Sequence, residues 1–311
     1  MIINDIFLGT DDKLRSGWRF AIFVLSFLIA AGSLSTLMII SFRDLLQPGE
    51  EPGASWLMIS SLTMLVPALL IGWLCGKYLE GLPFEALGAS PSGLWLINLL
   101  LGLVIGAVTL MIAVGLALTF AGTRFLSNEF ATNDILYSLA VSGAVFFLGA
   151  AAEEALFRGY ILQTFARANL AWFAILMTAV FFGILHLGNP AAGPLSSLNT
   201  ALAGIWFGIA YLKTSDLWFV TGMHFVWNWM QGSVFGIEVS GLTKIVTHPV
   251  LKEIETGPTW IGGGEYGLEG GIVTTIAIIL STVVIYFLPI KTYPEMLALT
   301  SPSTPEKQSQ I

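Results

Sequence analysis

The stretch Ala151-Ala152-Glu153-Glu154-Ala155-Leu156-Phe157-Arg158 places two adjacent carboxylates and a guanidinium directly after an apolar run at 139–148. An ionised group at bilayer depth costs at least a few kcal/mol, so it needs a partner and is typical of a functional site. In a helix, Glu154 and Arg158 are four residues apart and can pair. Glu153 lies about 100° round the same helix, so it cannot share this bond equally. We therefore expect Glu153 to face a partner on another helix.

The composition is that of an integral membrane protein. Hydrophobic residues make up 55% of the chain and charged residues 11%, with a mean hydropathy of +0.81, whereas a soluble domain carries about 25% charged residues. The net charge of −7 argues against a nucleic-acid partner. Cys75 is the single cysteine, which excludes an intrachain disulfide and a cysteine-rich metal cluster.

Eight apolar segments are expected to cross the membrane as helices, which predicts an all-α, polytopic helical bundle. They cover residues 20–42, 54–76, 94–121, 135–168, 171–187, 195–212, 217–235 and 271–289. We expect a polar N-terminal segment at 1–17, a transmembrane domain at 18–290 and a disordered tail at 291–311. Gly204 and Gly208 form a small-xxx-small pair that predicts close contact between two helices.

The distribution of Lys and Arg predicts the orientation, because these residues are enriched in cytoplasmic segments. With the N-terminus inside, nine lie on the cytoplasmic side: Lys13, Arg15, Arg19, Lys77, Arg158, Arg167, Lys213, Lys291 and Lys307. Four lie on the outer side: Arg43, Arg124, Lys244 and Lys252. We therefore expect a protein of the plasma (inner) membrane with both termini in the cytoplasm and the long loop at 236–270 outside.

Two histidines in apolar segments are the candidate partners for Glu153. The turn between the fourth and fifth segments lies near Asn169, which is 16 residues after Glu153 and 17 before His186. Equal distances from the turn of an antiparallel hairpin mean equal depth, at about 1.5 Å per residue. His224 and Asn228 are four residues apart on the seventh segment and share one face. The sequence thus predicts a polar site shared by three helices.

Three motifs now carry a family resemblance. Glu153-Glu154-x-x-x-Arg158, Phe182-x-x-x-His186 and His224-x-x-x-Asn228 follow in this order on separate segments. They resemble the motifs of the CPBP intramembrane proteases, which include CAAX prenyl endopeptidases of the Rce1 type and bacteriocin-processing and immunity proteins, also called the abortive-infection family. The resemblance covers about 135–235, a third of the chain, and implies that this region is a catalytic core.

The resemblance implies an intramembrane endopeptidase in which Glu153 is the base and Glu154 with Arg158 supports it structurally, as does Phe182. Peptide hydrolysis needs an activated water and donors for the oxyanion. We expect His186 to hold the water and His224 and Asn228 to act as donors.

The resemblance also implies membrane lipid and a peptide or protein substrate, including lipidated ones, as partners. No cofactor is expected. The alternative is a Zn²⁺ ion bound by Glu153, His186 and His224, because a glutamate and two histidines are zinc ligands.

Two other classes of function remain open. One is a non-proteolytic bacteriocin-immunity or scaffold protein that keeps the motifs for stability. The other is a proton-coupled transporter in which Glu153 and the histidines relay protons, although the chain lacks the internal repeat typical of transporters. For the endopeptidase, the residues that precede Glu153 place it in the inner half of the bilayer. We therefore expect a cavity that opens to the cytoplasm.

Overall fold

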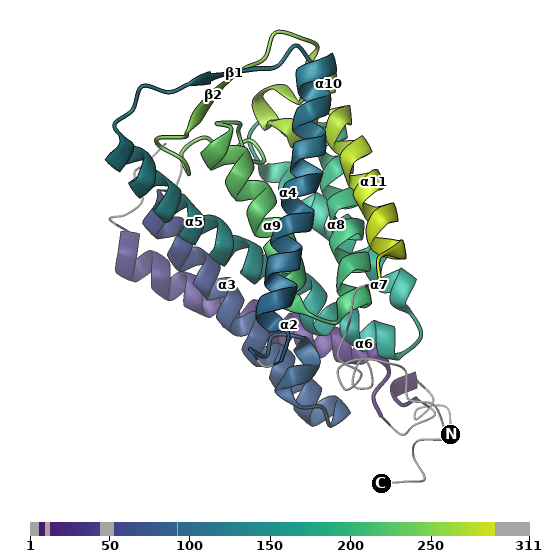
Figure 1. Cartoon of the computed structure of the whole chain (residues 1–311). Coiled ribbons are helices and arrows are strands. Elements are labelled where there is room, and N and C mark those ends of the chain that lie inside the picture. The colour runs from purple at the N-terminus through teal and green to yellow at the C-terminus, as the bar shows by residue number, and fades with distance from the viewer. Residues whose placement is uncertain (1–5, 10–12, 44–52, 92, 290–311) are drawn as a thin grey trace.

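The computed structural model describes residues 6–9, 13–43, 53–91 and 93–289 (Figure 1). The α-helices are α2 (Ser16–Phe42), α3 (Ala54–Cys75), α4 (Trp95–Phe120), α5 (Thr132–Glu154), α6 (Leu162–Arg167), α7 (Ala171–Leu185), α8 (Pro194–Thr214), α9 (Leu217–Trp229), α10 (Thr259–Gly262) and α11 (Ile272–Phe287). The tail expected at 291–311, together with 1–5 and 10–12 of the expected N-terminal segment, lies outside the described residues.

Short elements complete the fold. Three π-helical segments continue α3, α5 and α9: η2 (Gly76–Glu80), η4 (Ala155–Ile161) and η6 (Met230–Val234). The 3-10 turns are η3 (Phe84–Leu87), η5 (His186–Gly188), η7 (Gly264–Tyr266) and η8 (Leu268–Gly270). Strands β1 (Arg124–Ser127) and β2 (Leu251–Ile254) pair antiparallel, with Arg124 opposite Ile254. The segment between α4 and α5 and the long loop at 236–270 are therefore joined into a ribbon, seen at the top of Figure 1.

The prediction of an all-α membrane bundle is confirmed. Among the described residues, six helices are long and apolar enough to cross a bilayer. They are Ser16–Phe42, Ala54–Glu80, Trp95–Phe120, Thr132–Arg167, Ala171–Gly188 and Pro194–Thr214. The apolar helix α11 is shorter, and α9 is not among the six. The count of eight crossings therefore stays a prediction.

Glycines let the central helices approach closely. A Cβ atom added to Gly102 of α4 would lie 2.1 Å from the carbonyl oxygen of Phe219 in α9. In return, a Cβ atom on Gly222 of α9 would lie 2.6 Å from the carbonyl oxygen of Leu99. Only the missing side chains allow this backbone contact, which is how small residues hold membrane helices together.

The close contact predicted for Gly204 and Gly208 is present between α8 and α7. A Cβ atom on Gly204 would lie 2.7 Å from Cα of Ala179, and one on Gly208 would lie 3.2 Å from the Ile175 side chain. This contact holds α7 against α8, while α3 and α9 pack against α5. In Figure 1, α3 and α5 lean to the left of α9, and α8 and α11 stand to its right.

The end of the bundle near α6 is closely packed. Tyr160, Leu162 and Tyr211 are buried there in the apolar core. Glu80 at the end of η2 accepts hydrogen bonds from Arg19 of α2 and from Arg167 of α6, the latter through two contacts of 2.8 Å. These ion pairs join three segments of the chain at this end.

Candidate active site

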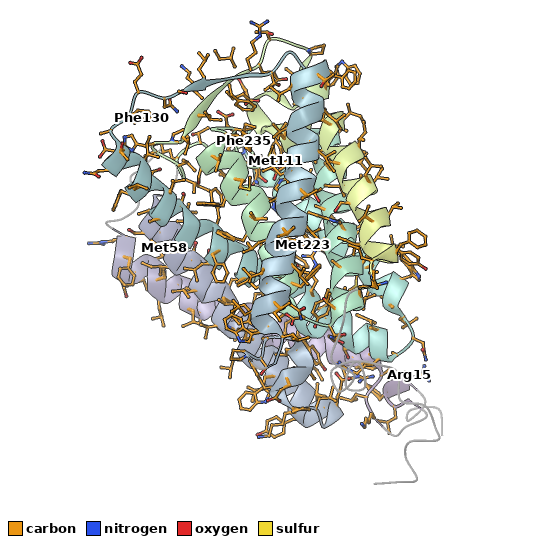
Figure 2. All side chains as sticks on the ribbon, in the orientation of Figure 1. Arg15, Met58, Met111, Phe130, Met223 and Phe235 are labelled. Carbon is orange, nitrogen blue, oxygen red and sulfur yellow. The ribbon has the colours of Figure 1, made fainter. Side chains whose placement is uncertain are left out.

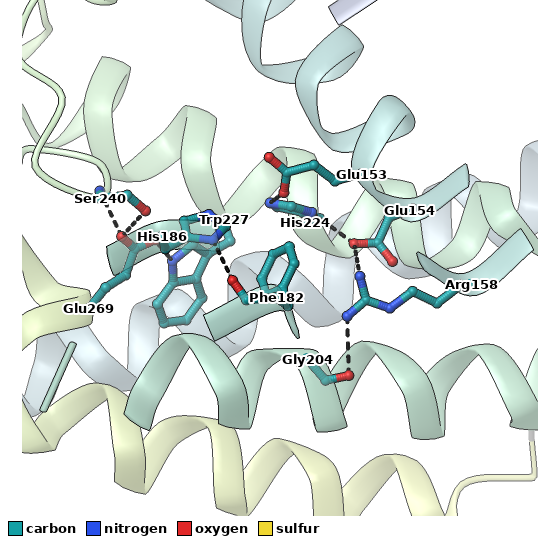
Figure 3. A network of polar contacts seen from close by, with 10 residues as sticks. All are labelled: Glu153, Glu154, Arg158, Phe182, His186, Gly204, His224, Trp227, Ser240 and Glu269. Atoms are coloured by element: carbon teal, nitrogen blue, oxygen red, sulfur yellow. Dashed lines mark hydrogen bonds and ion pairs between the residues drawn. The ribbon is translucent and has the colours of Figure 1, made fainter. Parts of the chain in front are cut away.

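The two adjacent glutamates lie where the rod Thr132–Arg167 changes from α- to π-helix. Glu154 is the last residue of α5, and Arg158 lies within η4. The sequence predicts a regular helix here, and the structure differs by this one π segment. Such segments occur frequently at functional sites. Figure 3 shows the polar network that surrounds them.

Glu154 is the buried centre of this network. Its Oε1 atom accepts from Arg158 Nη1 at 3.1 Å and from His224 Nδ1 at 2.9 Å. Arg158 also donates from Nη2 to the carbonyl oxygen of Gly204 at 3.1 Å, and the side chains of Glu154 and Arg158 are 0% exposed. The predicted pairing of Glu154 with Arg158 is therefore present. Because each charge is buried, removal of either partner would leave the other uncompensated.

Aromatic rings enclose the guanidinium of Arg158. Its Cζ atom lies 5.0 Å from the ring centroid of Phe182 and 5.3 Å from that of Phe207. Phe207 in turn stacks on the ring of His224 with centroids 4.8 Å apart. Phe182 thus packs between Arg158 and His186, and its supporting role stays a prediction.

Glu153 points away from this pair and towards the cavity. Its side chain is 28% exposed, and its Oε2 atom lies 3.8 Å from Nε2 of His224. Oε2 makes no hydrogen bond within the described part of the chain, although it is buried from solvent. A separation of 3.8 Å is longer than a hydrogen bond and leaves both atoms available to one water molecule beside them.

Both motif histidines are fixed through the same ring nitrogen. His186 donates from Nδ1 to the carbonyl oxygen of Phe182 at 2.7 Å, and His224 uses Nδ1 for its bond to Glu154. The bond at one nitrogen fixes the orientation of the ring and the role of the other nitrogen. Each histidine therefore keeps Nε2 for a ligand in the cavity.

A cavity of about 320 Å³ brings together the four residues that the sequence predicts to be catalytic. Glu153 of α5, His186 of η5, and His224 and Asn228 of α9 all line it. The equal-depth argument for the first hairpin thus agrees with the structure. The catalytic roles of the four residues stay predictions.

The comparison with known proteins bears on the same region. A family model described as type II CAAX prenyl endopeptidase Rce1-like matches residues 135–230. This segment is similar to the Rce1-like family. It contains all three motifs, and the resemblance drawn from them is confirmed. The chain is also similar to the uncharacterized protein YyaK of Bacillus subtilis (strain 168), with 27% identity over 213 residues that cover 65% of this chain and 68% of that protein.

The Rce1-like segment supplies most but not all of the cavity wall. Leu57, Ser61 and Met64 of α3 also line the cavity, as do residues of the loop at 236–270. Sequence outside the matched segment therefore shapes the space in which a substrate would lie.

The ligands of the zinc alternative are not gathered as a metal site among the described residues, and the alternative stays a prediction. Within the described ranges, no group of three His, Cys, Asp or Glu side chains is placed to hold a metal ion. Glu153, His186 and His224 line one cavity, but they are not gathered round a single point at the distances of about 2.0–2.2 Å that zinc ligands adopt.

Glu269 is a site residue that sequence reasoning missed. It lies in η8, lines the cavity, and accepts from the backbone N–H and the hydroxyl of Ser240, both at 2.7 Å. Its other oxygen accepts from Trp227 Nε1 at 3.2 Å. Burial raises the pKa of Glu269, and the hydrogen bonds from Ser240 oppose that rise. Figure 3 shows His186 and Phe182 between Glu269 on one side and the Glu154–Arg158 pair on the other.

The expected opening of the cavity towards the cytoplasm stays a prediction, because the orientation of the bundle in the membrane is a prediction too. The cavity runs from Glu153 to Asn189, Ser240 and Ile245, which lie in the loops that the sequence analysis placed outside. Towards the other end, Arg158 and Leu162 are 0% exposed. The expectation rested on the depth of Glu153 along its helix, and depth does not determine which end of the bundle is packed shut.

Proposed function

We propose that the chain is an intramembrane endopeptidase that hydrolyses a peptide bond in a membrane-associated or lipidated polypeptide, with Glu153 as the base. The observation that carries this proposal is the convergence of Glu153, His186, His224 and Asn228 on one cavity. The Rce1-like description of residues 135–230 supports a protease of the CAAX type. The protein is an integral membrane protein, so its substrate reaches the site from a membrane environment.

In the proposed reaction, Glu153 removes a proton from a water molecule held beside Nε2 of His186. The oxygen of that water forms a bond to the carbonyl carbon of the peptide, and the carbonyl oxygen becomes an oxyanion. His224 and the amide of Asn228 donate hydrogen bonds to it, because oriented donors are most effective where charge develops. Since Nδ1 of His224 already donates to Glu154, this step uses the imidazolium form of His224, in which Nε2 carries a proton as well. The C–N bond then breaks, and Glu153 returns the proton to the leaving amine.

The buried pair prepares the site for this chemistry. Glu154 holds Nδ1 of His224, and Arg158 compensates the charge of Glu154. The ring of His224 is thereby fixed with Nε2 near Glu153 before a substrate arrives. Such preorganisation means that little rearrangement is needed when the transition state forms.

The proposed mechanism requires no metal ion. Cleavage by the purified protein is therefore expected to persist after treatment with a zinc chelator. Loss of cleavage on chelation, with recovery on addition of Zn²⁺, would support the zinc alternative instead.

The decisive experiment compares membranes from cells that express the wild type, Glu153→Gln or Glu265→Gln. Glu265 is an exposed glutamate in η7 and serves as the matched control. Proteomics is expected to find cleavage products with the wild type and the control that are missing with Glu153→Gln. If all three proteins give the same fragments, the assignment of Glu153 as the base is wrong. If membranes without the protein give these fragments too, the non-proteolytic immunity or scaffold function is favoured.

A further inference from the structure

Glu269 is a carboxylate of the cavity that the proposed reaction does not use. It lies in η8 and lines the cavity together with Glu153. Its carboxylate accepts from the backbone N–H and the hydroxyl of Ser240, both at 2.7 Å, and from Nε1 of Trp227 at 3.2 Å. Hydrogen bonds to the charged form of a carboxyl group favour that form. These donors therefore hold Glu269 in place as a carboxylate.

The donors to Glu269 are all neutral, which distinguishes it from the two glutamates of the first motif. Glu154 is paired with Arg158. Glu153 has Nε2 of His224 at 3.8 Å. Glu269 forms no ion pair with a basic side chain in the described part of the chain. Because a charge withdrawn from water is usually paired with an opposite charge, Glu269 is the carboxylate of the cavity best able to attract a cationic ligand.

The basic side chains of the protein lie elsewhere. In the described ranges, no Lys or Arg is among the residues that line the cavity. Arg19 and Arg167 are bound to Glu80 at the end of the bundle that holds α6. Figure 2 shows Arg15 at that end as well, opposite to Phe235. A cavity lined by acidic side chains of this kind concentrates cations and repels anions.

Glu269 can accept one more hydrogen bond from a ligand. A carboxylate offers about four acceptor sites on its two oxygens. Ser240 uses Oε2 twice, whereas Trp227 uses Oε1 once. The remaining site on Oε1 suits an ammonium or guanidinium group, because hydrogen bonds between ionised groups are stronger than those between neutral ones. Figure 3 shows the indole ring of Trp227 beside Glu269, and such a ring also attracts cations.

We propose that Glu269 is the recognition subsite for a basic residue of the substrate, a Lys or Arg close to the peptide bond that is cleaved. Because Glu153 and Glu269 line one cavity, a peptide bound at Glu153 has neighbouring residues within the cavity that holds Glu269. That the cation belongs to a polypeptide rests on the proposed endopeptidase function. The preference for a cation rests on the charges and hydrogen bonds of the cavity alone.

Binding of synthetic peptides tests the subsite without any need for cleavage. The protein carries Glu153→Gln, which prevents hydrolysis by the proposed mechanism and leaves Glu269 as the acidic side chain of the cavity. It is placed in nanodiscs of phosphatidylcholine, so that the lipid does not select among charged peptides. The probes are fluorescent apolar peptides with both ends blocked. They differ in one residue, Lys, Met or Glu, which is moved through each position in turn.

At one position, the Lys peptide is expected to bind about tenfold more tightly than the Met peptide, because a hydrogen bond between ionised groups contributes about that factor or more. The Glu peptide is expected to bind more weakly than the Met peptide at the same position. Addition of Glu269→Gln should abolish the preference for Lys. Glu269→Asp, which keeps the charge, and Glu265→Gln, the exposed control in η7, should retain it.

The first comparison stays decisive even if Glu269→Gln does not fold, because it is made on protein in which Glu269 is intact. Equal affinities for the Lys and Met peptides at every position would overturn the proposal, and so would binding of none of the peptides. A preference for Lys that a folded Glu269→Gln protein keeps would overturn it as well.

The cleavage sites found by proteomics separate the subsite from the proposed function. Sites that depend on Glu153 are expected to have Lys or Arg at one fixed position near the cleaved bond. Sites without such a residue would contradict the subsite and leave the endopeptidase standing. The expected binding of the Lys peptide, together with a fragment pattern that Glu153→Gln leaves unchanged, would contradict the assignment of the base and leave the cation subsite standing.

Discussion

Glu153 and Glu154 are neighbours in the chain, but they have opposite environments. Glu154 is 0% exposed and receives donors from two helices, whereas Glu153 is 28% exposed and faces the cavity. One helical position, about 100° of rotation, separates a buried, paired carboxylate from the one that we propose to be reactive.

Glu154→Gln is expected to destabilise the fold, because it leaves the guanidinium of Arg158 buried without its counter-charge. Removing one partner of a buried ion pair costs about 3–5 kcal/mol. Thermal unfolding in detergent should therefore show a clearly lower Tm for Glu154→Gln than for Glu153→Gln, whose Tm should stay close to that of the wild type. Equal Tm values for the two variants would contradict this division of roles.

Glu269 is expected to hold the loop at 236–270 over the cavity through its bonds to Ser240. Glu269→Ala removes the acceptors of three donors, two of them on Ser240 and one on Trp227, and hydrogen bonds to a charged group contribute about 1.5–3 kcal/mol each. Limited proteolysis should cut this loop faster in Glu269→Ala than in Glu265→Ala, the exposed control in the same loop. Identical rates of cutting would show that Glu269 does not anchor the loop.

The residues that could be predicted from the sequence are those whose partners follow from helical spacing. Glu154 and Arg158 are one helical turn apart, and His186 is as far from its turn as Glu153. Glu269 could not be found in this way. It contacts Ser240, 29 residues away in a largely irregular loop, and no periodicity links the two positions.

At the scale of the elements, α4 and α9 cross at backbone contact. Gly102→Ala is expected to lower the Tm, because the new Cβ atom would lie 2.1 Å from the Phe219 carbonyl oxygen and force the helices apart. Overpacking of this kind costs about 1–3 kcal/mol. Gly115→Ala in the same helix is the control, because nothing lies within 4 Å of its added Cβ atom. A loss of stability in Gly115→Ala as large as that in Gly102→Ala would contradict the explanation.

The ribbon is expected to make stability depend on pH. Burial, followed by the charges of Glu255 and Glu238, raises the pKa of Glu253 in β2 from 4.5 to about 7. The folded state therefore holds this proton more tightly than the unfolded state. The resulting stabilisation is fully present below pH 4.5 and is lost as the pH rises through about 7.

Glu253→Gln replaces the titrating carboxyl group with a neutral amide. The substitution should therefore raise the Tm at pH 8, where Glu253 is charged, more than at pH 4.5. Thermal unfolding at the two pH values measures the difference. An increase of the same size at both would show that the titration of Glu253 is not the cause.

At the scale of the whole molecule, composition was sufficient to predict a helical membrane bundle. The eight apolar segments predicted where its long helices lie in the sequence. The antiparallel ribbon of β1 and β2 was not foreseen, because its strands are 4 residues long and more than 120 residues apart. The direction in which the cavity opens cannot be derived from the sequence either. It depends on which end of the bundle is packed, and packing is a property of helices that are assembled.

Eight crossings require both termini to lie on one side of the membrane and the long loop on the other. Topology reporters fused after Lys307 and inserted near Glu255 are therefore expected to report opposite sides. A reporter fused before the first helix should agree with the one after Lys307. If the reporters after Lys307 and near Glu255 give the same side, α11 does not cross, and the bundle has fewer crossings than predicted.

The π-helical segment Ala155–Ile161 connects α5 to α6. Its length determines how the side chains of α6 are rotated about the helix axis relative to those of α5. A residue added to or removed from a helix turns everything beyond it by about 100°. In the present phase, Gln163 contacts Tyr211 at 2.7 Å and Arg167 reaches Glu80, while Glu153 faces the cavity. Loss of one residue from this segment would break that alignment even in an unbroken helix. The number of residues between the glutamates and α6 is thus constrained as strictly as their identity.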